Sequence, residues 1–427
     1  MSVEQLYTIY QQHPSVQTDT RKLKAGDIFF ALKGDNFNGN QFARQALEQG
    51  ASYAVIDEKE YELPGKTILV ADVLTTLQQL AGYHRSRFSI PFLAITGSNG
   101  KTTTKELVHA VLSTTFTTYT TGGNLNNHIG IPLTLLKIKA DARIAVIEMG
   151  ANHQKEIEGY CTYTRPTHGL ITNAGKAHLE GFGGEAGVKK GKGELYDYLR
   201  HQAGTAFVMW DYDYLRQMSE GIPHIIRYGT GNADVEGEAV QSEPFLEVRL
   251  KKWNGAAATL QTQLVGSYNL PNVLAAVAAG QHFGVAPEQI KKAIEAYTPT
   301  NSRSQLIEKD SNKIILDAYN ANPSSMRLAI ENFARMQAPD KVLMLGAMAE
   351  LGPQSLSEHQ GIADLVAQYA WKEVVLVGGD FLKINHPFRR FENAAEAGKW
   401  FRQQHFTQTH ILIKGSRSMQ MEKVIAG

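Results

Sequence analysis

A glycine-rich stretch between an apolar run and a helix-like run constrains this chain more than any other feature. It occupies Leu93–Glu106, and two glycines, Gly97 and Gly100, stand just before Lys101 and Thr102. Glycines so placed let successive backbone N–H groups converge on a phosphate at a helix N-terminus, where the helix dipole also favours anions. In such a turn the lysine reaches the terminal phosphates, and the threonine hydroxyl holds Mg²⁺.

The spacing of this stretch is shorter than the common phosphate-loop pattern, because Ile95 stands where the first glycine is expected. The context favours a nucleotide site, since Lys105–Leu112 repeats apolar residues at helical spacing. We therefore expect a strand, a phosphate-binding turn and a helix, with a glycine-rich turn that binds nothing as the alternative. The nucleotide-binding residues expected in the turn are Gly97, Ser98, Asn99, Gly100, Lys101, Thr102 and Thr103.

Length and composition describe an ordinary globular protein with several domains. The chain has 427 residues, too many for one core, and 43% of them are hydrophobic. Lys and Arg number 43 against 42 Asp and Glu, so no basic field points to nucleic acid or an anionic membrane. The single cysteine, Cys161, excludes an intramolecular disulfide and fits a reducing compartment. Because no leader-like or membrane-spanning run is visible, we expect a cytoplasmic protein without membrane insertion.

Apolar runs of strand length alternate with helical runs along the chain, which predicts an α/β protein of three domains. Residues 1–90 form a small α/β unit. Residues 91–298 are typical of a mostly parallel sheet with crossover helices, as in phosphate-loop proteins. Residues 299–427 form a third, Rossmann-like α/β unit. The strands expected in the last two units are Ile144–Ile147, His168–Thr172, Lys313–Leu316, Lys341–Leu345, Glu373–Val377 and His410–Ile413.

Polar residues follow the strands of the central segment, at the ends where such sheets bind phosphates. Glu148 comes directly after one expected strand and Asn173 after the next. A carboxylate there completes a Mg²⁺ site with the threonine of the phosphate turn, whereas a solvated strand end is the alternative. His178 is a further candidate metal ligand, in competition with an ordinary surface or core histidine.

The segment that follows His178 is dense in glycine. This composition predicts a loop that is mobile unless something orders it. Chemistry alone does not single out Lys192 from the other lysines of this segment. The glycines are Gly181, Gly183, Gly184, Gly187, Gly191 and Gly193.

Side-chain amides and hydroxyls gather at further turns. Amides in Asn124–Asn127 either cap turns or bind a polar substrate. The segment Asp317–Ser325 follows an expected strand and offers a carboxylate, amides and hydroxyls, although its last four residues are also a good helix start. In the first unit, Asp19–Arg21 and Lys33–Gly39 are either a diphosphate or sugar site or ordinary loops, and the residues alone favour loops.

Together these segments resemble the Mur ligase superfamily, ATP-dependent amide-bond ligases of peptidoglycan synthesis with domains for a nucleotide sugar, ATP and an incoming amino compound. The resemblance runs nearly end to end and is strongest to the branch that joins D-alanyl-D-alanine to UDP-N-acetylmuramoyl-tripeptide through an acyl phosphate. The segments that carry it are Asn124–Pro132, Glu148–Asn152, His178–Gly183, Asp317–Ser324, Leu345–Gly352 and Lys414–Arg417.

The resemblance implies roles for residues at matching positions. Lys101, His178 and Lys192 become catalytic, and Lys192 matches a lysine that CO₂ carbamylates in these ligases. Two Mg²⁺ ions are implied, with Thr102, Glu148, His178 and Lys192 as metal-site residues. Beyond the turn, the nucleotide contacts implied are Asn269, Asn272, Arg303 and Asp317. The substrate contacts implied are Thr20, Arg21, Asn38, Gly39, Asn124, Asn126, Asn127, Asn320, Asn322 and Ser324.

Three positions depart from the family pattern. Tyr268 stands for a frequent histidine and can still stack on a base. Ala347 stands for a frequent aspartate and removes a carboxylate near the expected dipeptide site, while Trp210–Asp213 matches a usual asparagine–aspartate stretch only loosely. The identity of the incoming amine is therefore the least constrained part of the interpretation.

Two alternatives from other classes remain at this point. A sibling ligase adds a single amino acid to a shorter UDP-peptide, or glutamate to folate, although Asp19–Arg21 and Asp317–Ser324 argue against the folate branch. A nucleotide-binding protein without catalysis is the other alternative. We expect a monomer, and the sequence does not specify the diamino acid at position three of the tripeptide.

Overall fold

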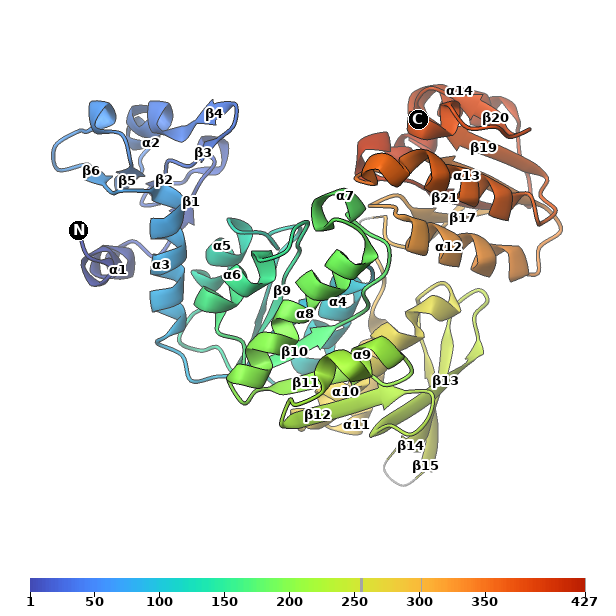
Figure 1. Ribbon diagram of the computed structural model, residues 1–427, viewed down its shortest axis with the longest axis horizontal. Coiled ribbons are helices and arrows are strands. Elements are labelled where there is room, and N and C mark those ends of the chain that lie inside the picture. The colour runs from blue at the N-terminus through green and yellow to red at the C-terminus, as the bar shows by residue number, and fades with distance from the viewer. Residues whose placement is uncertain (254–255, 301, 427) are drawn as a thin grey trace.

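Figure 1 shows the computed structural model as three α/β units in chain order, blue at the left, green to yellow in the middle and red at the upper right. The structure describes residues 1–253, 256–300 and 302–426. Each unit is built around its own sheet, of four, nine and six strands. The predicted three-part α/β architecture is confirmed. Within the described ranges, no helix is both long and apolar enough to cross a bilayer.

The first unit has a parallel sheet in the order β1-β2-β5-β6 and a small separate hairpin. Its last helix joins it to the central unit: Arg85 donates to the carbonyls of Thr164 and Arg165 at 2.8 and 2.9 Å. Its elements are α1 Val3–Gln12, β1 Val16–Gln17, β2 Ile28–Phe30, β3 Lys33–Gly34, β4 Phe37–Asn38, α2 Ala43–Glu48, β5 Tyr53–Ile56, β6 Thr67–Leu69 and α3 Val73–Arg85.

The central unit has a nine-stranded sheet in the order β15-β14-β13-β12-β11-β10-β7-β9-β8. Its strands are β7 Phe92–Thr96, β8 Thr118–Thr120, β9 Ile144–Glu148, β10 His168–Ile171, β11 Thr205–Met209, β12 His224–Gly229, β13 Val235–Gln241, β14 Glu247–Trp253 and β15 Ala256–Gln261. Its helices are α4 Lys101–Leu112, α5 Gly130–Leu135, α6 Glu156–Thr164, α7 Leu179–Phe182, α8 Glu185–His201, α9 Asp213–Ser219, α10 Leu270–His282 and α11 Pro287–Ala296. The sheet is parallel from β13 to β8, whereas β14 and β15 are antiparallel, which the sequence did not predict.

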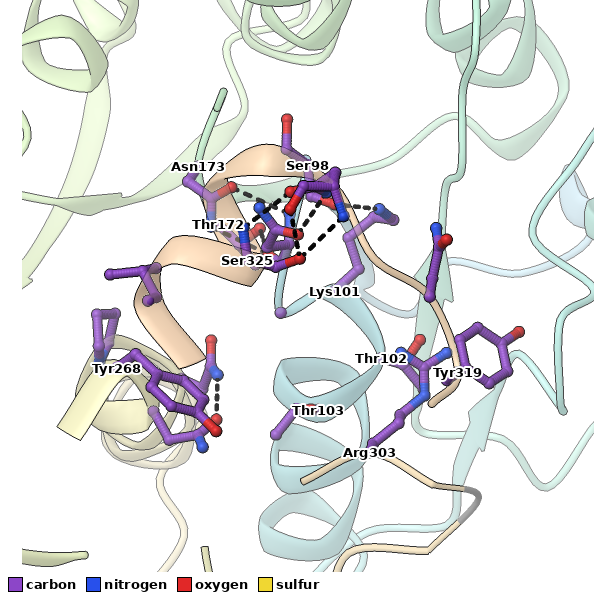
Figure 2. Close-up of a pocket in the computed structure, with 18 of the residues that line it drawn as sticks. Ser98, Lys101, Thr102, Thr103, Thr172, Asn173, Tyr268, Arg303, Tyr319 and Ser325 are labelled. Atoms are coloured by element: carbon purple, nitrogen blue, oxygen red, sulfur yellow. Dashed lines mark hydrogen bonds between the residues drawn. The ribbon is translucent and has the colours of Figure 1, made fainter. Parts of the chain in front are cut away.

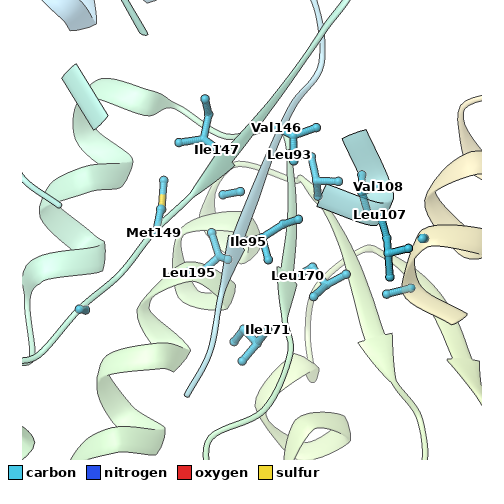
Figure 3. Close-up of a cluster of buried hydrophobic side chains, with 14 of the residues drawn as sticks. Leu93, Ile95, Leu107, Val108, Val146, Ile147, Met149, Leu170, Ile171 and Leu195 are labelled. Carbon is cyan, nitrogen blue, oxygen red and sulfur yellow. The ribbon is translucent and has the colours of Figure 1, made fainter. Parts of the chain in front are cut away.

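The core of the central unit explains why the phosphate turn has a fixed position. All five residues of β7 are buried, because the strand lies between β9 and β10 with helices on both faces. Figure 3 shows Leu93 and Ile95 of β7 among Val146, Leu170 and Leu195. The predicted strand, turn and helix are confirmed, so a buried strand and a packed helix hold the turn at both ends.

Two glycines of the turn have positions that no other residue fits. Gly97 has φ 142° and a Cβ on it would lie 2.0 Å from Thr172 Oγ1. Gly100 has φ 80° and a Cβ on it would lie 2.7 Å from Asn272 Oδ1. Left-handed backbone and close neighbours both require glycine here.

The glycine-dense segment after His178 is helical, so the prediction of a loop was wrong. Helices α7 and α8 cover it, and Lys192 lies in the middle of α8. A Cβ on Gly187 would lie 1.8 Å from the carbonyl oxygen of Phe182, and one on Gly191 would lie 2.4 Å from its ring. These glycines allow α7 and α8 to pack closely, so tertiary contact outweighs their low helix propensity.

The third unit has a six-stranded sheet in the order β16-β17-β21-β18-β19-β20, parallel except for the β16–β17 hairpin. All four predicted strands of this unit are present, and β16 and β20 are additional. Its elements are β16 Gln305–Lys309, β17 Asn312–Asp317, α12 Pro323–Arg335, β18 Lys341–Gly346, α13 Ser355–Val366, β19 Glu373–Val377, β20 Arg389–Phe391, α14 Ala394–Gln403 and β21 His410–Lys414.

Candidate active site between the central and C-terminal units

A cavity of about 750 Å³ lies between the central and C-terminal units. On the central side it is lined by the phosphate turn and by residues at the ends of β9, β10 and β11. On the other side it is lined by residues that follow β17 and by one face of α12. Figure 2 shows the first turn of α12 beside the phosphate turn, with Arg303 and Tyr319 near Thr102. The location agrees with the rule that such sheets bind ligands at the carboxyl ends of their strands.

The phosphate turn presents fewer backbone donors than the sequence suggested. The N–H of Ser98 donates to the carbonyl of Asn173 at 2.9 Å, and the N–H of Asn99 to its Oδ1 at 3.0 Å. The remaining donors belong to Gly100 and the first turn of α4, whose N–H groups have no acceptor within the helix. An anion is therefore favoured at the N-terminus of α4.

Lys101 lies folded over the turn. Its Nζ donates to the carbonyls of Gly97 at 2.6 Å and Ser98 at 3.2 Å. Burial lowers the pKa of Lys101 and Arg303 lowers it further, while Glu148 acts in the opposite direction. Two cationic side chains therefore lie near each other at this end of the cavity, as a polyphosphate requires.

Glu148, at the end of β9, carries an unsatisfied oxygen. Its Oε1 accepts from Thr102 Oγ1 at 3.1 Å and from Asn126 Nδ2 at 2.8 Å. Its Oε2 is buried and has no hydrogen-bond partner in the described part of the chain, and the residue is only 1% exposed. A buried carboxylate oxygen without a donor is unfavourable alone, and with a threonine hydroxyl beside it fits a hard cation.

Lys192 is buried within the same wall, at 1% exposure. Its Nζ donates to the carbonyl of Ala151 at 3.0 Å, and Ala151 itself lines the cavity. Burial lowers the pKa of Lys192 well below its usual value, and the nearby charge of Lys101 lowers it further. Burial therefore favours the neutral amine, which is the nucleophilic form of a lysine side chain.

A chain of amides lines the cavity beyond the turn. Thr104 Oγ1 donates to Asn272, Asn272 Nδ2 donates to Asn269 Oδ1, and Asn269 Nδ2 donates to the carbonyl of Val265. Both asparagines are buried, so these contacts fix their orientations. The neighbouring Tyr268 also lines the cavity, and its hydroxyl lies 2.9 Å from Ser304 Oγ of the C-terminal side.

Arg303 and Asp317 lie together on the C-terminal side of the cavity. The guanidinium carbon of Arg303 lies 3.6 Å from the ring centroid of Tyr319. Asp317 accepts the N–H of Ser304 at 3.2 Å and pairs with Lys414 Nζ. Tyr319 and Lys414 have no predicted role, although both lie in segments that carry the family resemblance.

Three family models match the chain in order. They are the Mur ligase family catalytic domain over residues 14–85, the Mur ligase middle domain over residues 95–280, and the Mur ligase glutamate ligase domain over residues 302–417. A relative from Bacillus subtilis strain 168, named UDP-N-acetylmuramoyl-tripeptide--D-alanyl-D-alanine ligase, is 34% identical over 96% of this chain and 92% of its own. The chain belongs to the Mur ligase family.

Further relatives extend this match. A protein of the same name from Escherichia coli strain K12 is 34% identical over 96% of this chain and 92% of its own. The solved structure named MurF from Acinetobacter baumannii has a TM-score of 0.88 at 31% identity, and it covers 100% of this chain and 98% of that one. The Mur ligase fold thus extends over the whole chain, as the resemblance implied.

The cavity gathers many of the residues predicted for a Mur ligase site. It is lined by the phosphate turn from Ser98 to Thr103 and by Asn124, Asn126, Asn127, Glu148, His178, Asn269, Asn272, Arg303, Asp317, Asn320 and Asn322. Gly97 and Lys192 are hydrogen-bonded to the lining residues Lys101 and Ala151, whereas Ser324 is hydrogen-bonded to Lys176, outside the lining. Sequence reasoning missed further lining residues on α12, namely Leu328, Glu331, Asn332 and Arg335, because no motif marks them.

His178, predicted to hold a second metal ion, engages the C-terminal unit in this structure. Its Nδ1 pairs with the Glu350 carboxylate. Across the described ranges, no group of three or more His, Cys, Asp or Glu side chains is arranged to hold a metal ion. Because Nδ1 is engaged by Glu350, an ion bound by His178 would use Nε2. The role of His178 as a metal ligand stays a prediction.

The residues predicted at the UDP-sugar do not reach this cavity. Thr20 begins a short turn in which Arg21, 87% exposed in its side chain, pairs with Asp19 at 2.8 Å. Asn38 Nδ2 donates to Glu58 at 2.8 Å, and a Cβ on Gly39 would lie 2.3 Å from the carbonyl oxygen of Leu32. Their substrate roles stay predictions.

The three departures from the Mur ligase pattern lie at different depths. Tyr268 lines the cavity, as do Asp211 and Tyr212 of the loosely matching stretch. Ala347 is 2% exposed and is not among the lining residues, and its N–H donates to the carbonyl of Val377 at 2.9 Å. The alanine at 347 is thus part of the C-terminal core behind the cavity.

Proposed function

We propose that this Mur ligase joins D-alanyl-D-alanine to UDP-N-acetylmuramoyl-tripeptide, with conversion of ATP to ADP and phosphate. The observation that carries the proposal is that a phosphate turn, the unsatisfied carboxylate of Glu148 and the buried amine of Lys192 share one wall of a cavity that the C-terminal unit closes. The length of the match supports it, since relatives named for this reaction align with 96% of the chain.

The reaction needs two substitutions in sequence. An oxygen of the tripeptide's terminal carboxylate bonds to the γ-phosphorus of ATP, and ADP leaves. The amine nitrogen of the dipeptide then bonds to the acyl carbon, the carbon–oxygen bond to phosphate breaks, and the amine gives up a proton. Phosphoryl transfer depends mainly on positioning and charge stabilisation, which the start of α4, Lys101 and Arg303 supply on this cavity's walls.

Glu148 and Thr102 are the residues that would hold Mg²⁺. The buried Oε2 of Glu148 has no hydrogen-bond donor among the described residues, and the Thr102 hydroxyl lies 3.1 Å from the other oxygen of the same carboxylate. A cation there would offset the repulsion between the polyphosphate and the incoming carboxylate. His178 is the residue proposed for a second ion, through Nε2.

Lys192 fits the chemistry of carbamylation. Burial lowers the pKa of this amine and so favours the neutral form, which is the form whose nitrogen adds to the carbon of CO₂ and then releases a proton. The product would be an anion next to the wall that holds Lys101, where it can support bound cations. This assignment gives a reason for placing a lysine, rather than an apolar residue, in the interior of α8.

We assign the domains as residues 1–90 for the UDP-sugar, 91–298 for ATP, and 299–427 for the dipeptide and for completing the nucleotide site. Thr20, Arg21, Asn38 and Gly39 then belong to the sugar-nucleotide site in the first domain. We propose a monomer that works in the cytoplasm.

Phosphate release tests the proposal. The protein is incubated with ATP, Mg²⁺ and UDP-N-acetylmuramoyl-tripeptide, with and without D-alanyl-D-alanine. The released phosphate is measured, and the product is identified by mass spectrometry. Release that needs both substrates, with a UDP-muramoyl-pentapeptide product, is the expected result. Release with a single amino acid instead would make the protein a sibling ligase, and bound ATP without release would exclude ligation.

A further inference from the structure

The first turn of α12 contacts the phosphate turn across the joint between the two units. Asn322 Nδ2 donates to Asn99 Oδ1 at 2.8 Å. Asn322 is only 7% exposed, and it belongs to the C-terminal unit, whereas Asn99 lies between the two glycines of the phosphate turn. A single side-chain contact therefore links the loop expected to bind phosphates to the start of a helix in another unit.

The direction of this hydrogen bond is fixed by the fold. Asn322 is the N-cap of α12, and its Oδ1 accepts the N–H of Ser325 at 2.9 Å. Because the cap uses the oxygen, the amide nitrogen is the atom that faces Asn99. The oxygen of the Asn99 amide must then point toward α12. One side chain thus serves both as a helix cap and as a donor across the joint.

The backbone of Asn99 makes its hydrogen bonds within the central unit. Its N–H donates to Asn173 Oδ1 at 3.0 Å, and its carbonyl accepts from Thr172 Oγ1 at 2.6 Å and Asn173 Nδ2 at 3.0 Å. Only the side chain of Asn99 reaches out of the unit. This arrangement makes it the part of the phosphate turn that responds to the position of the C-terminal unit.

Ser324, in the same first turn of α12, makes a second contact with the central unit. Ser324 Oγ accepts the N–H of Lys176 at 2.9 Å, and a Cβ on Gly175 would lie 2.8 Å from that Oγ. Ser98 Oγ donates to the carbonyl of Gly175 at 2.8 Å. The phosphate turn and the segment of Gly175 and Lys176, both of which contact α12, are therefore also hydrogen-bonded to each other. The first turn of α12 therefore contacts the phosphate turn and the segment that supports it.

From this geometry we infer that Asn322 is a positioning residue for the phosphate turn. It holds Asn99, and through it the Ser98–Gly100 backbone, in the arrangement that phosphoryl transfer requires, so the turn is complete only when the C-terminal unit is docked. The sequence resemblance gave Asn322 and Ser324 a substrate role, and their contacts here are with protein groups instead. The inference rests on the proposed ligase reaction for its kinetic readout alone.

Four full-length variants test it: Asn322→Ser, Asn99→Ala, the double variant and Asn393→Ser. Serine keeps the cap of α12 but is too short to reach Asn99. Asn393 is a matched control because it is also an asparagine N-cap in the same unit, with its Oδ1 accepting from Glu396 N–H at 3.0 Å on the exposed start of α14. Asn99→Ala leaves every cap intact, which keeps the test sound if Asn322→Ser folds poorly.

The first readout is hydrogen exchange of the amides of residues 97–100, without nucleotide or substrate. We expect exchange about three- to tenfold faster in Asn322→Ser and in Asn99→Ala, since one buried hydrogen bond is lost in each. The double variant should be no faster than either single variant, and Asn393→Ser should match the parent. Unchanged exchange in Asn322→Ser, or two effects that multiply in the double variant, would overturn the inference.

The second readout is the rate of phosphate release in the complete reaction. Asn322→Ser and Asn99→Ala should lower kcat by a similar factor, with the KM for UDP-tripeptide unchanged, whereas a substrate contact would raise that KM. A raised KM with normal kcat would therefore return Asn322 to the substrate site. If no variant and no parent protein releases phosphate, the ligase proposal fails, while the exchange experiment still decides the role of Asn322.

Discussion

The central wall of the cavity and its C-terminal wall use similar polar side chains but hold them differently. On the central wall, Lys192 and Glu148 are buried and are held by groups of their own unit. On the C-terminal wall, Asn322 is hydrogen-bonded to Asn99 of the central unit. Lys192 and Glu148 are therefore held within one unit, whereas the contact of Asn322 exists only when the two units are docked.

This difference decides what a substitution can reveal. A change on the central wall should alter chemistry while the units stay docked. A change on the C-terminal wall should alter docking or local stability first, and chemistry as a result. The four predictions below test that division, beginning with the largest expected effect.

Replacing Lys192 by alanine should reduce phosphate release about a thousandfold or more, because the proposed anion beside the metal site would be lost. Binding of ADP should change little, since the phosphate turn lies on other elements. The measurement is turnover together with ADP affinity. Lys190→Ala, an exposed lysine on the same helix, is the control. Near-normal turnover of Lys192→Ala would remove this residue from the mechanism.

Replacing Lys414 by methionine should destabilise the C-terminal unit by about 3 kcal/mol, because Asp317 would keep a largely buried charge without its partner. The two side chains are 2% and 17% exposed. Lys372→Met breaks an exposed pair with Asp340, 41% and 42% exposed, and should change stability by less than about 1 kcal/mol. Chemical unfolding compares the two. Equal effects would show that burial of the Lys414 pair does not matter.

The sequence predicted the central wall better than the C-terminal wall, for a physical reason. A buried strand, a glycine turn and an amphipathic helix are local patterns, so β7, the phosphate turn and α4 were readable from Phe92–Leu112. Glu148 was readable because it follows a buried strand. The cavity face of α12 could not be predicted, because it lines the cavity only through the docking of two units. No local pattern in the sequence marks that contact.

In the glycine-dense segment after His178, a local pattern was present but predicted the wrong structure. Composition alone predicted a mobile loop, yet α8 is a long helix from Glu185 to His201. The deciding interaction is the close approach of Phe182 to Gly187 and Gly191, which joins residues on two helices. The family resemblance singled out Lys192, whereas the local chemistry of the segment did not.

Replacing Glu148 by glutamine should lower activity about a hundredfold and raise the Mg²⁺ concentration needed for half-maximal rate. The amide keeps the size of the side chain but removes the charge that a cation would neutralise. A Mg²⁺ titration of phosphate release measures both effects. Glu158→Gln, an exposed carboxylate on α6, is the control and should titrate like the parent. A Mg²⁺ requirement unchanged in Glu148→Gln would contradict the metal assignment.

The smallest effect is expected from His359, which is fully buried on α13. Its Nε2 accepts the N–H of Met348 at 3.0 Å, close to the segment that carries Glu350. Burial lowers the pKa of His359 below its usual 6.5, although Ser355, Asp380 and Glu358 act in the opposite direction. The unfolded chain therefore binds the proton more readily, so stability should be complete above about pH 6.5 and fall as the pH drops through that value.

Thermal unfolding of the C-terminal unit at several pH values tests the predicted direction of this stability change. The parent should lose about 2 °C on acidification beyond what His359→Gln loses, since glutamine does not titrate. A His386→Gln variant, altering a histidine elsewhere in the same unit, should follow the parent. If His359→Gln and the parent melt in parallel, docking of the Glu350 segment does not depend on this proton.

The packing of α7 against α8 also has a consequence for how the site assembles during folding. Gly187, Gly191 and Gly193 each lower the intrinsic helicity of α8 by about 1 kcal/mol relative to alanine. The isolated segment is therefore a poor helix, and it gains order only when Phe182 seats against its glycines. Until that event, the lysine amine at position 192 stays in water and keeps its proton. The burial that lowers the pKa of Lys192 is thus a property of the folded protein, and it arises only when α8 is packed.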